Sequence, residues 1–104
     1  MTDARGFLQS LIGKPLHTVT GRRNRILGVS GDTVSVWTTR SPGGQDVPLA
    51  WVQAAIDRLE QQGEVEISVE SVRYRSAFIG AVLQELPGAE VVRSSPPKIR
   101  LRRR

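Results

Sequence analysis

The amino-acid sequence predicts an α+β fold, in which helices and antiparallel strands alternate along a chain of 104 residues. Two observations lead to this prediction. Apolar residues recur at helical spacing in several stretches, and segments rich in β-branched residues with alternating polarity lie between them. Gly and Pro separate most of these segments, as expected for turns. A chain of this length is sufficient for one domain with a small additional lobe.

The front part of the chain, residues 1–47, is predicted to form a helix followed by a small β-meander. Apolar side chains within residues 3–13 fall on one helical face. They are Phe7, Leu8, Leu11 and Ile12. Residues 16–20 are rich in β-branched side chains and are predicted to form a strand. Residues 25–29 and 33–39 flank a Ser-Gly-Asp turn, which is typical of a β-hairpin.

The back part, residues 48–104, follows a stretch at residues 40–47 whose composition predicts a loop. Pro48 stands at the favoured first position of a helix, which Gly63 ends. The apolar residues between them repeat at helical spacing: Leu49, Val52, Ala55, Ile56 and Leu59. Residues 64–68 then alternate apolar and acidic side chains, so a short strand is predicted.

Two further helices are predicted next, a short one at residues 69–72 and a longer one at residues 76–86, with Ser76 as its N-cap. The apolar face of the longer helix carries Phe78, Ile79, Val82, Leu83 and Leu86. The opposite face is mostly small and carries Ala77, Gly80, Ala81 and Gln84. After the stop signal Pro-Gly, residues 89–93 and 98–102 are predicted to form a second hairpin.

Helix, short strand, helix, helix, strand, turn, strand is the element order of a winged helix-turn-helix, with the last hairpin as the wing. The predicted fold class is therefore α+β, with a winged helix-turn-helix in residues 48–104. Residues 1–47 form a helix and β-meander extension to it. Each part is small for a core of its own, so we expect one cooperative unit. The alternative is that residues 76–86 form a buried amphipathic helix in another type of α+β domain.

The positive charge of the chain lies in separate clusters. The net charge is +5, from 15 basic and 10 acidic residues. The last seven residues carry five of the positive charges, and the remaining ten balance the acids. Other clusters are Arg22, Arg23 and Arg25 near one another, and Arg73 with Arg75. Separate basic patches favour a polyanionic partner, usually nucleic acid; the alternative is a solvated, solubilising tail.

The sequence offers little support for catalysis. His17, in a predicted strand, is the only histidine, and the absence of cysteine excludes disulfides and thiolate metal sites. No His, Asp and Glu cluster has metal-ligand spacing, and no Gly-rich phosphate loop is present. Glu64 and Glu66 share one face of a strand, where solvated acids are the simpler interpretation. We therefore predict that the protein is not an enzyme and has no catalytic residues, metal or cofactor.

DNA contacts are predicted at the start of the helix at residues 76–86, because the N-terminal end of a recognition helix usually reaches the bases. Arginine there offers bidentate donors to guanine, and a small apolar surface suits the methyl group of thymine or 5-methylcytosine. Arg40-Ser41 repeats the Arg75-Ser76 pair and is a second candidate contact. The full predicted set is Arg22, Arg23, Arg25, Arg40, Ser41, Arg73, Tyr74, Arg75, Ser76, Ala77, Gly80, Gln84, Lys98, Arg100 and Arg102, the last three being wing contacts to phosphate or the minor groove.

Three stretches resemble an actinobacterial domain found at the N-terminus of HNH-type, modification-dependent restriction endonucleases and in small free-standing relatives. They read GKPLHTVTGRRNRILGV, RSPGGQDVPLAWVQAAIDRLEQQGEVEISV and YRSAFIGAVLQELPGA, and the similarity covers about residues 7–89. The resemblance implies a winged-helix reader of 5-methylcytosine in double-stranded DNA, with base reading at Tyr74–Phe78. No HNH motif occurs in this sequence, so a reader without nuclease activity is expected.

The expected partner is double-stranded DNA carrying methylated cytosine, and a homodimer on DNA is one arrangement that stays open. No apolar run approaches membrane-spanning length, and the N-terminus lacks the pattern of a signal peptide. A cytoplasmic, nucleoid-associated location without a membrane partner is therefore expected. Two alternatives are a sequence-specific winged-helix transcription regulator and a non-catalytic interaction subunit of a restriction system.

Overall fold

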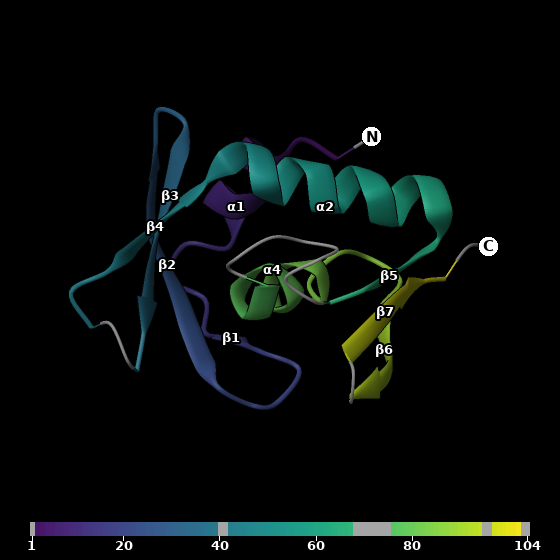
Figure 1. Cartoon of the computed structure of the whole chain (residues 1–104). Helices are drawn as coiled ribbons and strands as arrows, with labels where there is room; N and C mark the ends of the chain where they lie inside the picture. Colours follow the sequence, from purple (N-terminus) through teal and green to yellow (C-terminus); the bar gives the residue numbers. More distant parts are fainter. Residues whose placement is uncertain (1, 40–41, 68–75, 95–96, 103–104) are drawn as a thin grey trace.

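Helices and two antiparallel sheets make up the computed structural model of the chain (Figure 1). The structure describes residues 2–39, 42–67, 76–94 and 97–102. Its helices are α1 (Ala4–Ser10), α2 (Leu49–Gln62) and α4 (Ser76–Leu83). The predicted α+β class is confirmed. None of the helices in the described part of the chain has the length and apolar character needed to span a membrane.

The front sheet is a four-stranded meander with the strand order β1-β2-β3-β4. Its strands are β1 (Leu16–His17), β2 (Arg23–Ser30), β3 (Thr33–Thr38) and β4 (Gln45–Pro48). The strand predicted at residues 16–20 is limited to two residues, because the chain turns at Thr18. The Gly21 N–H donates to the Thr18 carbonyl over 2.9 Å, and the Thr18 N–H donates to the Arg22 carbonyl over 2.8 Å. This turn leads directly into β2.

Strand β4 corrects the prediction of a continuous loop at residues 40–47. Gln45, Asp46 and Val47 pair with β3, opposite Val36, Ser35 and Val34 respectively. Val47 is the only buried residue of the strand, so the sequence of β4 shows no alternation that predicts pairing. Because β4 leads straight into α2, it connects the front sheet to the back part without a linker. The Leu49 N–H at the start of α2 also donates to the Asp32 carbonyl in the β2–β3 turn, over 2.7 Å.

The rear sheet contains β5 (Glu64–Glu66), β6 (Ala89–Ser94) and β7 (Pro97–Leu101), in the order β5-β7-β6. Helix α2 reaches it through Gly63, whose φ of 82° lets the chain leave the helix in the left-handed conformation. In this strand order β7 lies in the middle of the sheet and pairs with both β5 and β6. The helix predicted at residues 69–72 lies outside the described residues.

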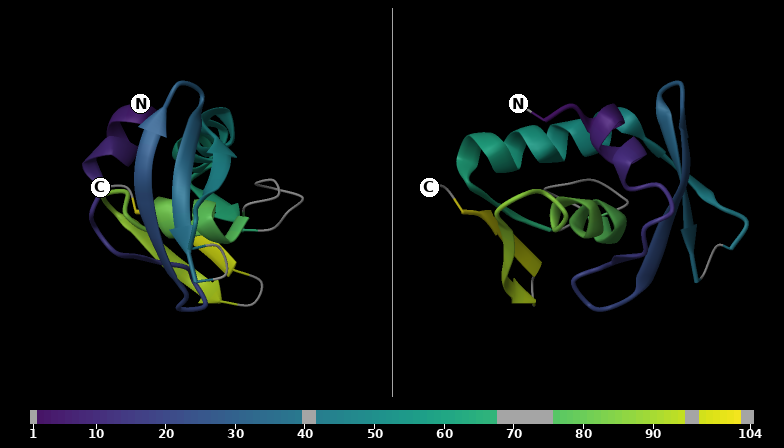
Figure 2. Two further views of the ribbon diagram at one scale, coloured as in Figure 1. Left: turned by 90° about the vertical axis from the view of Figure 1, so that its left-hand side faces the viewer. Right: turned by 180° about the vertical axis from the view of Figure 1, so that it is seen from behind.

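The two sheets stand at opposite ends of the molecule, with α4 between them and α2 running across the top (Figures 1 and 2). One cluster of buried apolar side chains joins these layers. It includes Leu8 of α1, Ile26 of β2, Ile56 of α2, Leu83 of α4 and Ile99 of β7. Residues 1–47 and 48–104 thus contribute to the same core, and the strand β4 crosses the division between them.

Helix α4 is buried on every side over most of its length. All six residues from Phe78 to Leu83 are buried, including the small residues Gly80 and Ala81. A Cβ added at Gly80 would lie 3.2 Å from Cγ2 of Ile67, so Gly80 lets the chain after β5 pack closely against α4. The prediction that Gly80 and Ala81 form an exposed surface facing a DNA groove is therefore wrong. Of the small-residue face, Ala77 is exposed.

Because the two parts share one core, a core substitution in residues 1–47 should also destabilise residues 48–104. We expect Leu8→Ala to lower the free energy of unfolding by about 2–5 kcal/mol, because a fully buried leucine is removed from α1. Hydrogen exchange of protected amides in α1 and α4 should accelerate by the same factor. Ile12→Ala is the control, since Ile12 is 46% exposed. Faster exchange in α1 with unchanged exchange in α4 would show that the two parts unfold separately.

Candidate nucleic-acid interface

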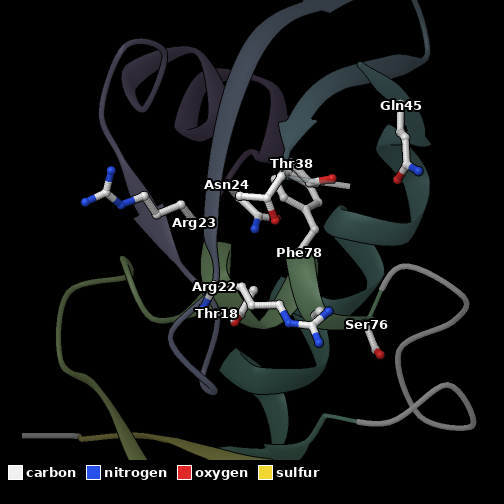
Figure 3. Close-up of a pocket in the computed structure, with 10 residues that line it drawn as sticks. Thr18, Arg22, Arg23, Asn24, Thr38, Gln45, Ser76 and Phe78 are labelled. Carbon is white, nitrogen blue, oxygen red and sulfur yellow. Dashed lines mark hydrogen bonds between the residues drawn. The ribbon is translucent and has the colours of Figure 1, made fainter. Parts of the chain in front are cut away.

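A recess of about 190 Å³ lies between the front sheet and the start of α4 (Figure 3). Residues from both parts of the chain line it, and they include Thr18, Arg22, Asn24, Thr38, Ser76, Ala77 and Phe78. Four residues of the predicted DNA-binding set lie around this one recess, namely Arg22, Arg23, Ser76 and Ala77. The fold therefore brings together two clusters that are more than fifty residues apart in the sequence.

The tight turn between β1 and β2 holds Arg22 at the recess. The backbone N–H of Arg22 donates to the Thr18 hydroxyl over 3.0 Å, and the Arg22 carbonyl accepts from the Thr18 N–H. Thr18 is itself 5% exposed and lies within 3.2 Å of the Thr20 hydroxyl. Because the turn is fixed by these bonds, the guanidinium group of Arg22 extends from a rigid backbone toward the α4 side of the recess (Figure 3).

Strand alternation divides the front arginines between two faces. Asn24 and Ile26 of β2 are buried and face inward, whereas Arg23 and Arg25 are exposed. Figure 3 shows the side chain of Arg23 directed away from Asn24. Arg25 pairs with Trp37 across the sheet, and these two residues share a shallow outer surface with Arg23 and Leu27. Arg22 is thus the arginine of this cluster whose side chain extends along the recess toward α4 (Figure 3).

The cations of the front cluster differ from those elsewhere in the described residues. Each of Arg22, Arg23 and Arg25 is exposed, and the structure records no ion pair or side-chain hydrogen bond for any of them within its described part. By contrast, Lys14 pairs with Glu85, and Arg5 donates to the Gly31 carbonyl. An exposed cation without an anionic partner can meet a phosphate without first breaking an ion pair.

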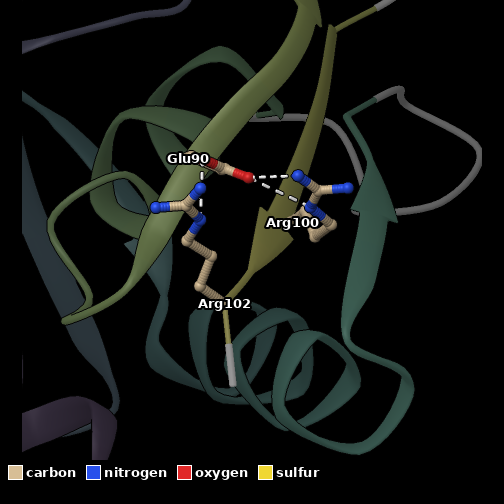
Figure 4. A network of polar contacts seen from close by, with 3 residues as sticks. All are labelled: Glu90, Arg100 and Arg102. Carbon is tan, nitrogen blue, oxygen red and sulfur yellow. Dashed lines mark hydrogen bonds and ion pairs between the residues drawn. The ribbon is translucent and has the colours of Figure 1, made fainter. Parts of the chain in front are cut away.

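The predicted wing cations are all paired with carboxylates on the outer face of the rear sheet. Lys98 lies 3.0 Å from Glu64, and both Arg100 and Arg102 pair with Glu90 (Figure 4). Arg93 and Glu66 form a further pair at 3.0 Å. Four cations therefore face three carboxylates here, and the surface is close to neutral. Exposed pairs of this kind add little stability, so their main effect is to compensate charge.

In the described residues, the pKa values of two carboxyl groups, Glu60 and Glu90, are held below their usual range. The hydrogen bond from Arg100 is the main cause that lowers the pKa of Glu90, and the charge of Arg102 adds to it against some desolvation. Near the end of α2, the Thr2 backbone N–H donates to Glu60 over 3.0 Å and lowers the pKa of Glu60. Both carboxylates therefore stay ionised at neutral pH, and Glu90 holds its two arginines there.

The remaining predicted contacts fall into two groups. Gln84 lies beyond the last residue of α4, at the end opposite Ser76, and donates to the His17 carbonyl over 3.1 Å. It joins α4 to β1 and does not border the recess. The second group lies outside the described residues: Arg40, Ser41, Arg73, Tyr74 and Arg75. Their predicted roles stay predictions.

Asn24 is the residue of this site that sequence reasoning missed. The predicted strand begins at residue 25 and leaves Asn24 out, but Asn24 lies in β2 and is 4% exposed. Its carboxamide points into the recess beside the ring of Phe78 (Figure 3). The only signal in the sequence is that Asn24 and Ile26 are separated by one residue, which places them on the same face of a strand once the strand is known to begin at Arg23.

The acidic side chains and the single histidine of the described residues are dispersed. No group of three or more His, Asp or Glu side chains there is arranged to hold a metal ion. His17 is exposed at the edge strand β1, and Glu64 and Glu66 belong to the ion-paired surface of the rear sheet. Comparison of the chain with family models, curated proteins and solved structures gives no match.

We expect Arg100→Ala to raise the pKa of Glu90 toward the ordinary value of a glutamate, because its main hydrogen-bond donor is lost. NMR titration of the Glu90 side-chain carboxyl measures this shift. Arg93→Ala is the matched control, since Arg93 pairs with Glu66. An unchanged pKa of Glu90 in Arg100→Ala would contradict the pairing.

The Glu90–Arg100 pair also sets the direction in which the stability of the protein changes with pH. A lowered pKa in the folded state stabilises the protein above the unfolded pKa of about 4.3, and this contribution is lost as the pH falls through the folded value. The wild type should therefore lose more stability than Glu90→Gln between about pH 6 and about pH 3.

Proposed function

We propose that the protein is a winged-helix reader of 5-methylcytosine in double-stranded DNA and that it does not cut the DNA. The element order of the back part supports the winged helix: α2, β5, then α4, then the hairpin β6–β7. The order β5-β7-β6 also supports it, because it attaches the hairpin to the strand that follows the first helix of this unit, as a wing requires. The methyl-reading part rests on the sequence resemblance.

The observation that carries the proposal is the position of Arg22 beside the start of α4. The recess brings an exposed arginine without a recorded partner in the described residues next to Ser76 and Ala77. Free N–H groups and the positive end of the helix dipole at a helix N-terminus favour phosphate. Arg22 from the front part and the start of α4 from the back part thus form one surface suited to a DNA backbone segment.

The burial of α4 determines how such a helix can meet DNA. Its flank is covered from Phe78 to Leu83, so it cannot lie lengthwise in a groove. Contact is left to the N-terminal end, where Ser76 is partly exposed and Ala77 is exposed. Recognition helices do use N-terminal residues for base contacts. We therefore place base reading at Ser76 and Ala77 together with the preceding Arg73, Tyr74 and Arg75.

Methyl recognition by contact alone gives a weak preference. One buried methyl group contributes about 0.8 kcal/mol, whereas a tenfold preference needs about 1.4 kcal/mol. Ala77 offers an exposed apolar side chain for this contact. Stronger selectivity requires a second contribution, such as shape exclusion or a methyl group on the other strand contacted through Arg40-Ser41.

A protein-interaction module is the second candidate, and the rear sheet favours it. The edge strand β6 exposes 41% of Val91 and 46% of Val92, next to a charged surface that is almost neutral. An exposed edge strand with apolar side chains can pair with a strand of another protein. Such a module should bind DNA poorly at any salt concentration.

Titration of matched methylated and plain duplexes at several salt concentrations tests the proposal. We expect tighter binding of the methylated duplex by a few-fold and a steep loss of affinity with salt. Arg22→Ala should weaken binding to both duplexes and make the salt slope shallower by roughly one unit, because one phosphate contact is lost. Arg58→Ala, an exposed arginine of α2, is the control for the charge change.

The two duplexes also separate the candidate functions. Equal affinity for both, with steep salt dependence, would indicate a sequence-specific regulator. Little binding to either would favour the interaction module. Within the reader proposal, Arg75→Ala should abolish most of the methyl preference. Lys98→Ala should keep it, because Lys98 pairs with Glu64 on the far sheet.

A further inference from the structure

Asn24 is a buried polar side chain for which the structure records no hydrogen-bond partner. Its backbone pairs with Leu16 of β1 and Thr38 of β3, but its carboxamide has no recorded bond within the described residues. At 4% exposure it has little contact with solvent. No buried side-chain nitrogen or oxygen atom in the described residues lacks a hydrogen-bond partner, so the unbonded polar atoms of the Asn24 carboxamide are those that solvent reaches through the recess. A molecule bound in the recess can replace that solvent and hydrogen-bond to the carboxamide.

The recess has the size of one aromatic ring with substituents. A cavity of about 150 Å³ admits benzene, and this recess measures about 190 Å³. Phe78, 5% exposed, supplies an aromatic wall, and Thr18 and Thr38 supply small side chains around it. A flat ring that carries polar groups on one edge fits an apolar wall with a carboxamide beside it.

Arg22 and the start of α4 lie at the border of the same recess. The guanidinium group of Arg22 extends toward the α4 side, where Ser76 lies (Figure 3). This arrangement puts a cation beside a pocket for a ring. A nucleotide has the matching chemistry, because its phosphate is anionic and its base is a planar ring with donors and acceptors on one edge.

We propose that the recess receives a single pyrimidine base turned out of the nucleic-acid stack, and that Asn24 binds the edge of this base. The inference rests on the proposed function, because DNA binding through Arg22 and α4 brings the base to the recess. The carboxamide of Asn24 offers one acceptor and one donor side by side. Cytosine and 5-methylcytosine present the complementary amino donor and ring-nitrogen acceptor. The volume favours one ring over the two rings of a purine.

The experiment compares three forms of one DNA sequence that contains 5-methylcytosine: a paired duplex, the same duplex with an abasic position opposite the methylated base, and the single strand. If the base is turned out, removing its partner spares the cost of unpairing, so the wild type should bind the abasic duplex about tenfold more tightly or better than the paired duplex. Asn24→Leu, close in size but unable to hydrogen-bond, should reduce this ratio to near one. Asn24→Asp, which keeps the shape but loses the donor, should do the same.

The controls and outcomes separate this inference from the proposed function. Arg58→Ala should keep the wild-type ratio. Circular dichroism and thermal melting establish that both Asn24 variants are folded. The inference is overturned if the wild type binds the paired and the abasic duplex with equal affinity. It is also overturned if both Asn24 variants keep the wild-type ratio of these two affinities. Either result leaves DNA binding in place. If the single strand binds as tightly as the abasic duplex, the result supports base binding in the recess. It then also indicates that the base comes from single-stranded nucleic acid. Failure to bind any of the three forms overturns both.

Discussion

The burial of α4 on every side is the constraint on which the rest of the structure depends. A helix without a polar flank needs partners all round it, and here they come from α2, from β1 and from Ile67 after β5. Covering α4 therefore draws the front sheet and the rear sheet into one core. The same packing leaves only the N-terminal end of α4 accessible, and it creates the recess between that end and β2.

Charge compensation then distinguishes the two ends of the molecule. The rear sheet aligns basic and acidic side chains across its three strands, and each predicted wing cation has a carboxylate within reach. The front cluster has no such carboxylates recorded in the described part of the chain, and Arg22 is fixed by the turn at Thr18. We therefore expect a polyanion to bind on the recess side in preference to the outer face of the rear sheet, whereas the basic C-terminal residues had favoured the rear sheet.

Local patterns predicted the elements whose signal is contained within a short stretch. The period of α2, its end at Gly63 and the β2–β3 hairpin are of this kind. What could not be predicted depends on contacts between distant segments. Gly80 was assigned to an exposed face of small residues, because nothing near it in the sequence indicates that Ile67 packs against it. Asn24 had the composition of a turn, and its burial follows from pairing with Thr38 and from α4. The ion pair of Lys98 with Glu64 requires β5 to lie beside β7.

The most direct test of this account is to map which backbone amides respond when a short methylated duplex is added to isotope-labelled protein in NMR. If the recess side is the DNA-binding surface, the largest shifts fall on Thr18–Asn24 and on Ser76 and Ala77. The amides of β5 and of Glu90 should then change little. Largest shifts along β6 and β7, with the turn at Thr18 unaffected, would contradict the account and return the interface to the rear sheet.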